Sequence, residues 1–416
     1  MAKRPRRKPN KPYPSFPLTA HPNGQWCKKI LGKLHFFGVW AAPDAAHQNY
    51  LRIAEDLHAG RDPSPTAEGE FTVKELGNQF LAYQMQRVET GQIGGRWFED
   101  CRRVVRQFAR SIGTARPVKS LTADDFLNYR RLIGLRGLRG NKPLGVHAIT
   151  RTIVAIQSMF KWGVLTGVLE QLPRYGQAFA KPSAADVRRS RAKRERENGK
   201  KLFTADQILA LLSSAAPTVK VAILLGINGG FGNTDCSALP RTAIDLDRGL
   251  IDFERPKTAV RRIVPLWPET VTAIRALLDG ERPKPASDEA KPLLFRSEQG
   301  YALVRQTIQR SDGGEIKKVV YIDRLGDWFD GLLVELKLKR YGLGFYSLRH
   351  TFRTWADDCG DQHAIHRVMG HSIPGMSGVY IEEIGLERLR RVVNLVRSRV
   401  WPQFDGAAVT PQAATG

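Results

Sequence analysis

The stretch Met369–Tyr380 reads MGHSIPGMSGVY and places a histidine and a tyrosine on either side of a glycine-containing loop. Tyr380 follows His371 by nine positions, with Pro374 and Gly375 between them. A phenol has a pKa of about 10, so it acts as a nucleophile only where neighbouring donors or positive charges stabilise its oxyanion. Groups of this kind should therefore occur elsewhere in the chain.

Two further stretches supply such groups. The segment FYSLRHTFRTW, Phe345–Trp355, carries Arg349 on a predicted helix, and an arginine fork is suited to bidentate phosphate binding. Lys257 lies in a predicted hairpin turn and is able to transfer a proton. Together with His371 and Tyr380, these two residues suit nucleophilic attack on a phosphodiester.

The composition also indicates a partner that carries phosphodiesters. The chain has 416 residues, of which 42% are hydrophobic and 9% aromatic, so it is long enough for two or three domains with hydrophobic cores. Its formal net charge is +24, from 65 Lys and Arg against 41 Asp and Glu. A charge of this size attracts polyanions over long range, and double-stranded DNA is the partner we expect.

The cysteines and the hydropathy of the chain indicate its environment. Neither a disulfide framework nor a cysteine-based zinc site is expected, because the four cysteines are scattered and form no Cys-x-x-Cys pair. No segment approaches the roughly 20 apolar residues of a membrane span, and no apolar stretch follows the basic N-terminus. We expect a cytoplasmic, nucleoid-associated protein with no membrane contact.

Periodicity predicts mainly helical structure with small sheets. Strands are expected near Trp26–Ile30 and Leu34–Trp40, followed by a helix over Asp44–His58. Four amphipathic helices follow between Phe71 and about Gln171, the first opened by the capping box Thr72-x-x-Glu75. Further on, the pattern predicts helices over 204–212, 219–227 and 386–400, and a strand hairpin over 250–254 and 262–266.

Residues 181–201 form the most basic stretch, with nine basic and three acidic residues and no apolar periodicity. The segment is interpreted as a linker whose charge suits a strand that crosses a DNA backbone, although such a run can also be solvated chain or an address signal. Its candidate DNA-binding residues are Arg188, Arg189, Arg191, Lys193, Arg194, Lys200 and Lys201.

The C-terminal half resembles the tyrosine recombinase (phage integrase) family. The family's His-x-Leu-Arg-His box falls on Tyr346, Leu348, Arg349 and His350. Its Leu-Gly-His box, with a nucleophilic tyrosine nine residues later, falls on Met369, Gly370, His371 and Tyr380. By the same comparison, Lys257 resembles the family's catalytic lysine.

The resemblance implies a multidomain fold that is mainly α-helical with a small β-sheet in the catalytic domain. Its parts are a basic arm and possible arm-type DNA-binding module (1–66), a helical core-binding domain (71–175), a basic linker (176–201), a mixed α+β catalytic domain (202–400) and a flexible tail (401–416). It also implies a catalytic set of Tyr380, Arg349, His371, Lys257 and Tyr346, a 3′-phosphotyrosyl intermediate, no nucleotide or metal cofactor, and a homotetramer on paired DNA sites.

One departure from the family concerns its first arginine, which lies in a Gly-x-Arg-x-x-Glu motif. Here Gly230 matches the glycine and Asp235 the acidic residue, while Gly232 stands in place of the arginine. Loss of one preorganised donor typically costs on the order of 10² to 10³ in rate. Three explanations stay open: another residue fills the position, the site runs with one arginine, or the protein binds DNA without cutting it. The candidates for the replacement are Arg241, Arg261 and Arg262.

Two other interpretations compete with this one. A type IB topoisomerase uses the same tyrosine chemistry, but the basic arm and the order of the domains disfavour it. A zinc site is the second, because four residues of the types that zinc favours lie within thirteen positions: Cys359, His363, His366 and His371. Gly360 and Asp361 are typical of a turn between helices, and the resemblance gives His371 a phosphate role, so no metal is expected.

Overall fold

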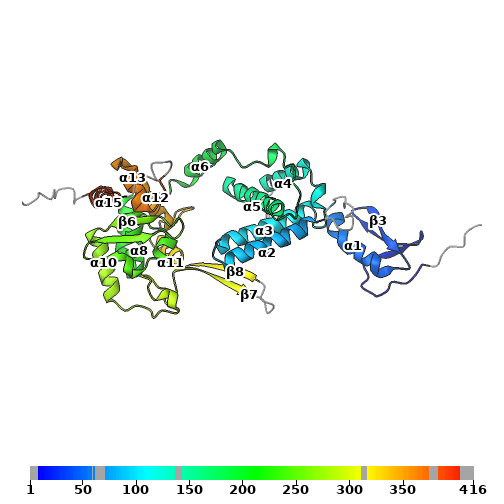
Figure 1. The fold of residues 1–416 in the computed structure, drawn as a ribbon, viewed down its shortest axis with the longest axis horizontal. Coiled ribbons are helices and arrows are strands. Elements are labelled where there is room, and N and C mark those ends of the chain that lie inside the picture. The colour runs from blue at the N-terminus through cyan, green and yellow to red at the C-terminus, as the bar shows by residue number, and fades with distance from the viewer. Residues whose placement is uncertain are drawn as a thin grey trace, which may run out of the picture. The chain divides into compact units, whose positions relative to one another are not determined.

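A computed structural model describes residues 8–58, 60, 71–135, 143–310, 316–373 and 383–402. The chain forms two compact units, one of Met1–Arg191 with Gly314–Lys318 and one of Ala192–Gly313 with Val319–Gly416 (Figure 1). The N-terminal half of the predicted basic arm (1–7) and the predicted tail from 403 onward lie outside the described residues. No helix within the described ranges is long and apolar enough to cross a membrane.

The first unit begins with a small sheet covered by a helix. Strands β1 (Thr19–His21), β2 (Gln25–Ile30) and β3 (Lys33–Val39) pair antiparallel in sequence order, and α1 (Pro43–His58) packs on them. The turn between β2 and β3 requires positive φ at Gly32 (+83°). The predicted strands and helix are confirmed. Their shared core contains Phe16, Leu18, Trp26, Ile30, Phe37, Ala46, Tyr50 and Leu57.

Four longer helices follow, as the sequence predicted: α2 (Val73–Glu89), α3 (Gly95–Ile112), α4 (Ala123–Leu135) and α5 (Val146–Leu165), with the short 3₁₀ turns η1 (Val118–Ser120) and η2 (Gln177–Phe179). Both bonds of the predicted capping box form: Glu75 N donates to Thr72 Oγ1 (3.2 Å) and Thr72 N donates to Glu75 Oε2 (2.8 Å). Phe108, Phe126 and Phe160 form an aromatic cluster at the centre of the helical core.

Within the basic segment, residues 184–198 form the helix α6 (Ala184–Asn198), which the sequence pattern did not predict. No residue of this helix is buried, so an apolar stripe could not have signalled it. Ser183 and Asp186 cap its start, with Asp186 N donating to Ser183 Oγ (3.1 Å). Alanine, arginine, lysine and glutamate then favour helix by intrinsic propensity alone.

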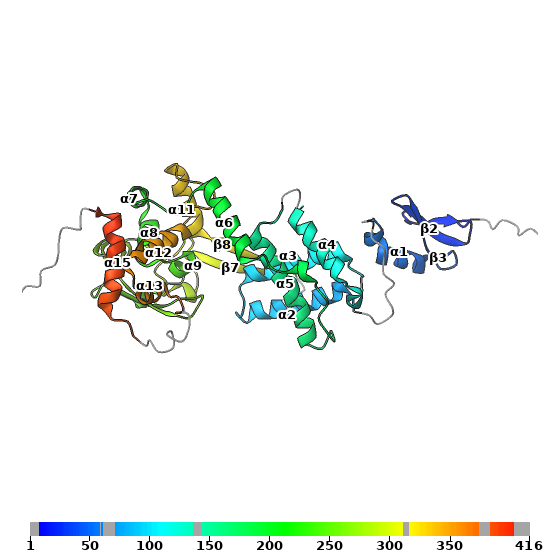
Figure 2. The same ribbon diagram turned by 90° about the horizontal axis from the view of Figure 1, so that it is seen from above.

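The second unit surrounds the buried helix α8 (Pro217–Gly229), which is in contact with α7 (Ala205–Ser214), α10 (Pro268–Asp279), α11 (Arg324–Glu335), α12 (Tyr346–Ala356) and α15 (Leu386–Val400). The described part of this unit also contains the helices α9 (Asn233–Ser237), η3 (Arg241–Ala243), η4 (Asp288–Ala290), η5 (Asp357–Cys359) and α13 (Gln362–Met369). Figure 2 shows α15 (red) in this unit together with α12 and α13. Leu389, Val393 and Val396 of α15 are buried, so this helix closes the core of its own chain.

Two small sheets complete this unit. Strands β4 (Ile244–Asp245), β5 (Leu250–Glu254) and β6 (Arg261–Pro265) form an antiparallel sheet, which contains the predicted hairpin. Strands β7 (Val304–Arg310) and β8 (Ile316–Asp323) form a pair that the sequence pattern did not predict. Strand β7 contains no buried residue, so it lacks the apolar alternation by which half-buried strands are recognised.

A buried asparagine fixes the end of α8 against β6. Asn228 Nδ2 donates to Pro265 O (2.9 Å), while its Oδ1 accepts from Trp267 N (2.9 Å) and Thr270 Oγ1 (3.0 Å). Buried amides are stable only when their polar atoms find such partners. The bonds therefore hold the residues that follow α8 at the edge of the sheet, where the candidate site begins.

Candidate phosphate-binding site

Two left-handed glycines bring distant segments of the second unit together. Gly230 (φ +65°) ends α8, and Gly370 (φ +62°) ends α13. A Cβ atom on Gly370 would lie 3.0 Å from Arg255 Cβ, at the end of β5. Thr258 Oγ1, in the turn between β5 and β6, donates to Gly370 O (3.1 Å). The close approach that glycine permits thus places this turn beside His371.

The centre of the site is one buried carboxylate shared by three arginines. Asp235 Oδ1 accepts from Arg255 Nε (3.3 Å), and its Oδ2 lies 3.4 Å from Arg262 Nη1 and 3.6 Å from Arg349 Nη1. Gly232 N also donates to Asp235 Oδ2 (3.0 Å). Three guanidinium groups against one carboxylate leave a formal excess of two positive charges in a poorly solvated region. Such a site attracts an anion.

Arg262 is fully committed to the protein. Its Nε donates to Val368 O (3.1 Å), its Nη2 to Gly229 O (2.5 Å), and its guanidinium lies 3.7 Å from the centre of the Phe231 ring. Burial lowers the pKa of Arg262 to about 9, which leaves the group charged at neutral pH. Arg262 therefore holds β6, α8 and α13 together and has no nitrogen left for a ligand.

Arg349 and His371, both predicted as site residues, lie in contact. Arg349 donates to Gly230 O and, through Nη2, to Met369 O (3.0 Å), and the same Nη2 approaches His371 Nε2. Because Nε2 accepts this contact, the neutral ring carries its proton on Nδ1. Burial, followed by the charge of Arg255, lowers the pKa of Arg349. Asp235 and Tyr346 oppose this shift.

The ring of His371 is half-buried, and burial together with the charges of Arg349 and Arg255 lowers the pKa of His371 to about 4. The group is therefore neutral at pH 7.

This depressed pKa predicts a pH-dependent stability. Between the usual value of 6.5 and about 4, the unfolded chain binds a proton at His371 that the native chain does not. The free energy of unfolding should therefore decrease as pH falls through this window, and less steeply in His371→Gln, whose amide oxygen can still accept from Arg349. Urea unfolding at pH 7.5, 5.5 and 4.5 measures this. The pKa of His366 is lowered as well, but its effect cancels because it is present in both proteins. Equal pH dependence in the two proteins would refute the prediction.

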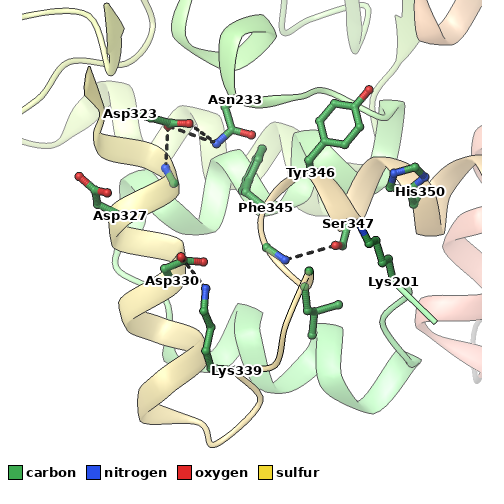
Figure 3. A pocket seen from close by; sticks show the side chains of 14 residues that line it. Lys201, Asn233, Asp323, Asp327, Asp330, Lys339, Phe345, Tyr346, Ser347 and His350 are labelled. Atoms are coloured by element: carbon green, nitrogen blue, oxygen red, sulfur yellow. Dashed lines mark hydrogen bonds and ion pairs between the residues drawn. The ribbon is translucent and has the colours of Figure 1, made fainter. Parts of the chain in front are cut away.

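The remaining predicted site residues are placed as follows. Lys257 is exposed in the turn between β5 and β6, next to the Thr258 bond to Gly370. Tyr346 is half exposed at the start of α12, where it lines a pocket together with Asn233 and His350 (Figure 3). Tyr380 and the predicted loop from Pro374 onward lie outside the described residues. The structure thus brings Arg349 and His371 together, while the nucleophile remains a prediction from sequence.

Two of the three candidates for replacing the absent arginine lie away from this cluster. Arg241 is exposed and donates to Lys291 O (3.4 Å), and Arg261 pairs with Asp252 on the surface. Arg255 was not among the candidates, yet it contacts Asp235. The alternation of β5 could have indicated it, because residues 251, 253 and 255 point to the same side and Ile251 is fully buried.

The basic helix is anchored at its C-terminal end. Arg340 donates to Asn198 O (2.6 Å), to Lys200 O and to Leu202 O (3.4 Å), which satisfies carbonyls that a helix end leaves open. Of the seven predicted DNA-binding residues, Arg188, Arg191 and Lys200 are exposed and form no ion pair within the described residues. Within the described parts of the chain, no group of His, Cys, Asp and Glu side chains is arranged to hold a metal ion.

Comparisons with known proteins agree with these features. No established family model matches the chain. The tyrosine recombinase XerA of Thermococcus kodakarensis is 29% identical over 201 residues, which make up 46% of this chain and 61% of that protein. A complex of the Tn1549 transposon integrase with transposon right-end DNA shares the fold at a TM-score of 0.52 and 15% identity, covering 79% of this chain and 100% of the solved chain. A lambda integrase dimer on a core site covers 97% of this chain and 100% of its own at a TM-score of 0.50 and 14% identity.

The fold is that of the integrases, mainly α-helical in several domains with small sheets, as predicted. The chain is thus similar in sequence to a tyrosine recombinase over part of its length and shares the integrase fold, in line with the resemblance of its C-terminal motifs to that family. The match extends over less than two thirds of the XerA protein.

Proposed function

We propose that the protein is a site-specific DNA recombinase that breaks and rejoins double-stranded DNA through a 3′-phosphotyrosyl intermediate. The observation that carries this proposal is the contact of Arg349 with His371 inside a cluster that carries excess positive charge. These residues come from α12 and from the end of α13, directly before the segment that contains Tyr380. The arrangement suits a phosphate held beside a tyrosine nucleophile.

In the proposed reaction, Tyr380 loses its phenolic proton to solvent as its oxygen attacks the phosphorus of a phosphodiester, and the bond from phosphorus to the 5′ oxygen breaks. Arg349 and the Nδ1–H of His371 bind non-bridging oxygens, and the phenol of Tyr346 can add a hydrogen bond. Lys257 donates a proton to the departing 5′ oxygen. A 5′-hydroxyl of a second DNA then attacks the phosphotyrosyl ester and gives its proton to Lys257; a new phosphodiester forms, the bond from phosphorus to the tyrosine oxygen breaks, and the released tyrosine takes up a proton from solvent. The ester conserves the energy of the original bond, so no nucleotide cofactor is required.

The assembly follows from this chemistry. Exchange between two duplexes requires cleavage at two positions in each, so four tyrosines act at one pair of sites, and we propose a homotetramer on DNA. The core-binding domain (71–175) and the basic segment (176–201) would contribute phosphate contacts. We propose the same for the module within 1–66, whose sheet leaves Lys29 and Lys33 exposed. Association with the nucleoid follows from these contacts.

A covalent-adduct assay tests the proposal. Binding sites are first selected by the protein from a random pool of duplexes. A nicked version of a selected site then releases a short fragment on cleavage, which prevents religation and accumulates the adduct on a denaturing gel. We expect an adduct in which the protein is joined to the 3′ phosphate of the retained strand, and a free 5′-hydroxyl on the released fragment. Protein that binds the site and forms no adduct on any nicked version would identify a DNA-binding protein without cleavage activity.

The basic segment gives a separate prediction. Replacing Arg188, Arg191 and Lys200 by glutamine should weaken DNA binding and reduce the slope of log affinity against log salt by about 0.9 for each phosphate that the variant no longer neutralises. Titrations of labelled duplex at several salt concentrations measure the slope. A matched triple variant at exposed basic residues elsewhere, Arg275, Lys284 and Lys291, should leave the slope unchanged. Equal effects of the two variants would mean that only net charge matters.

A further inference from the structure

The position of the absent arginine is crowded by a neighbouring ring. Gly232 has extended backbone angles (φ −96°, ψ 175°), so a side chain is conformationally allowed there. A Cβ atom on Gly232 would, however, lie 3.3 Å from two ring carbons of Tyr346. Tyr346 thus occupies the space next to Gly232, and a second phosphate-binding guanidinium has to enter the site from another element.

Among the three arginines of the Asp235 cluster, Arg255 has the most donors available. Every nitrogen of Arg262 is engaged by the protein, and Arg349 uses both Nη atoms on backbone carbonyls. Arg255 uses Nε alone, on Asp235, and its Nη atoms make no hydrogen bond within the described residues. Neither Nη atom is among the polar atoms that are sealed from solvent without a partner. These donors are therefore open to a ligand.

The side chain of Arg255 also lies in the required place. Its Cβ and Cδ atoms pass the backbone of Gly370, within 3.0 and 3.1 Å of where a Cβ atom would be, directly before His371. Its charge acts on both Arg349 and His371, since it contributes to the lowered pKa of each. The bond from Nε to Asp235 fixes the guanidinium, whose side chain is 9% exposed, and leaves both Nη atoms without a hydrogen bond within the described residues.

We propose that Arg255 is the second phosphate-binding arginine of this site and binds a non-bridging oxygen of the DNA phosphate that is cleaved. Arg349 binds from α12 and Arg255 from the end of β5, and Asp235 positions both. The inference rests on the proposed recombinase function, because it assigns a role in the same site. Arg255 then takes the role of the family's first arginine, although the position that matches it, Gly232, has no side chain.

The test compares Arg255→Ala and Arg255→Lys with wild type in the adduct assay under single-turnover conditions. We expect Arg255→Ala to form the adduct about 10² to 10³ times more slowly, with non-covalent affinity for the site nearly unchanged. Arg255→Lys keeps the charge without the fork and should be intermediate. The control is Arg261→Ala, which removes an exposed arginine from the adjacent strand and should form the adduct within about twofold of wild type.

A modified substrate separates phosphate binding from a structural role. In a methylphosphonate, a methyl group replaces one charged oxygen at the cleavage position, so less positive charge is needed. The deficit of Arg255→Ala relative to wild type should shrink at least tenfold on this substrate. A deficit that is equal on both substrates would overturn the proposal, as would an Arg255→Ala protein as fast as wild type. Thermal unfolding checks the variants, and Arg255→Lys carries the comparison if the alanine variant does not fold.

The two proposals fail differently. Absence of the adduct with wild-type protein on its selected sites would overturn the recombinase function and the role of Arg255 with it. An adduct formed by wild type and by Arg255→Ala at equal rates would leave the recombinase function standing and overturn the role of Arg255 alone.

Discussion

Replacement of Asp235 by alanine is expected to lower the free energy of unfolding by about 3–5 kcal/mol, because it leaves buried charge without compensation. Within the described residues, this is the only carboxylate that pairs with Arg255, Arg262 or Arg349, whose side chains are 9, 0 and 3% exposed. Its removal also takes away the acceptor of the Gly232 N–H. Urea unfolding of the full chain, followed by circular dichroism, measures the change.

Two further variants control this experiment. Asp235→Asn keeps an oxygen acceptor without the charge and should be less destabilised than Asp235→Ala. Asp252→Ala breaks the exposed pair with Arg261, which is about half exposed on both sides, and should cost less than about 1 kcal/mol. If Asp235→Ala were as stable as Asp252→Ala, the three guanidinium groups would have found other compensation, and the cluster would not depend on its carboxylate.

Replacement of Tyr380 by phenylalanine is expected to abolish the covalent adduct completely. The change removes only the attacking oxygen, so DNA affinity should stay within about twofold of wild type. The measurement is the nicked-duplex assay together with a gel-shift titration on the same DNA. An adduct that persists in Tyr380→Phe would assign the nucleophile to another residue.

The matched control is Tyr346→Phe, which removes a phenolic oxygen from the same site. Loss of one hydrogen bond to a phosphate oxygen should slow adduct formation by roughly 3- to 10-fold, in line with about 0.5–1.5 kcal/mol. Tyr380→Phe should therefore form no adduct, whereas Tyr346→Phe should form it more slowly. Complete loss in Tyr346→Phe would show that this residue does more than donate a hydrogen bond.

Sequence patterns predicted those helices and strands whose formation depends on residues within one short segment. The bonds of Thr72 with Glu75, the hairpin of β5 and β6, and the buried face of α15 all follow from spacing within one segment. The helix α6 was not predicted because it has no apolar stripe, whereas its caps and propensity are sufficient. The pair β7 and β8 escaped prediction for a related reason, the lack of a buried face on β7.

The candidate site was likewise predicted only in part from the sequence. The ordered motifs predicted Arg349 and His371, and the structure places them in contact. The cluster around Asp235 depends on contacts of α9 with the end of β5, with β6 and with α12, elements that lie far apart in the chain. No spacing within one segment encodes such contacts: the alternation of β5 could have indicated that Arg255 is buried, but its contact with Asp235 emerged only from the fold. The roles of Lys257, Tyr346 and Tyr380 stay predictions that the experiments above address.

The three arginines that share Asp235 also determine the charge balance along the reaction coordinate. A phosphodiester carries one negative charge, so binding DNA in the proposed site cancels only half of the formal excess of two. In that bound state the tyrosine is a neutral phenol; its deprotonation and attack give a pentacoordinate phosphorus with two negative charges, which cancels the excess fully. The protein is therefore better neutralised at the top of the barrier than in the bound state, which is the condition for lowering that barrier. The single carboxylate, Asp235, sets this charge balance. With a second acid, the net charge of the cluster would be +1 and would neutralise the bound phosphodiester instead of the transition state. With no acid, the fold would contain three arginine charges without a partner.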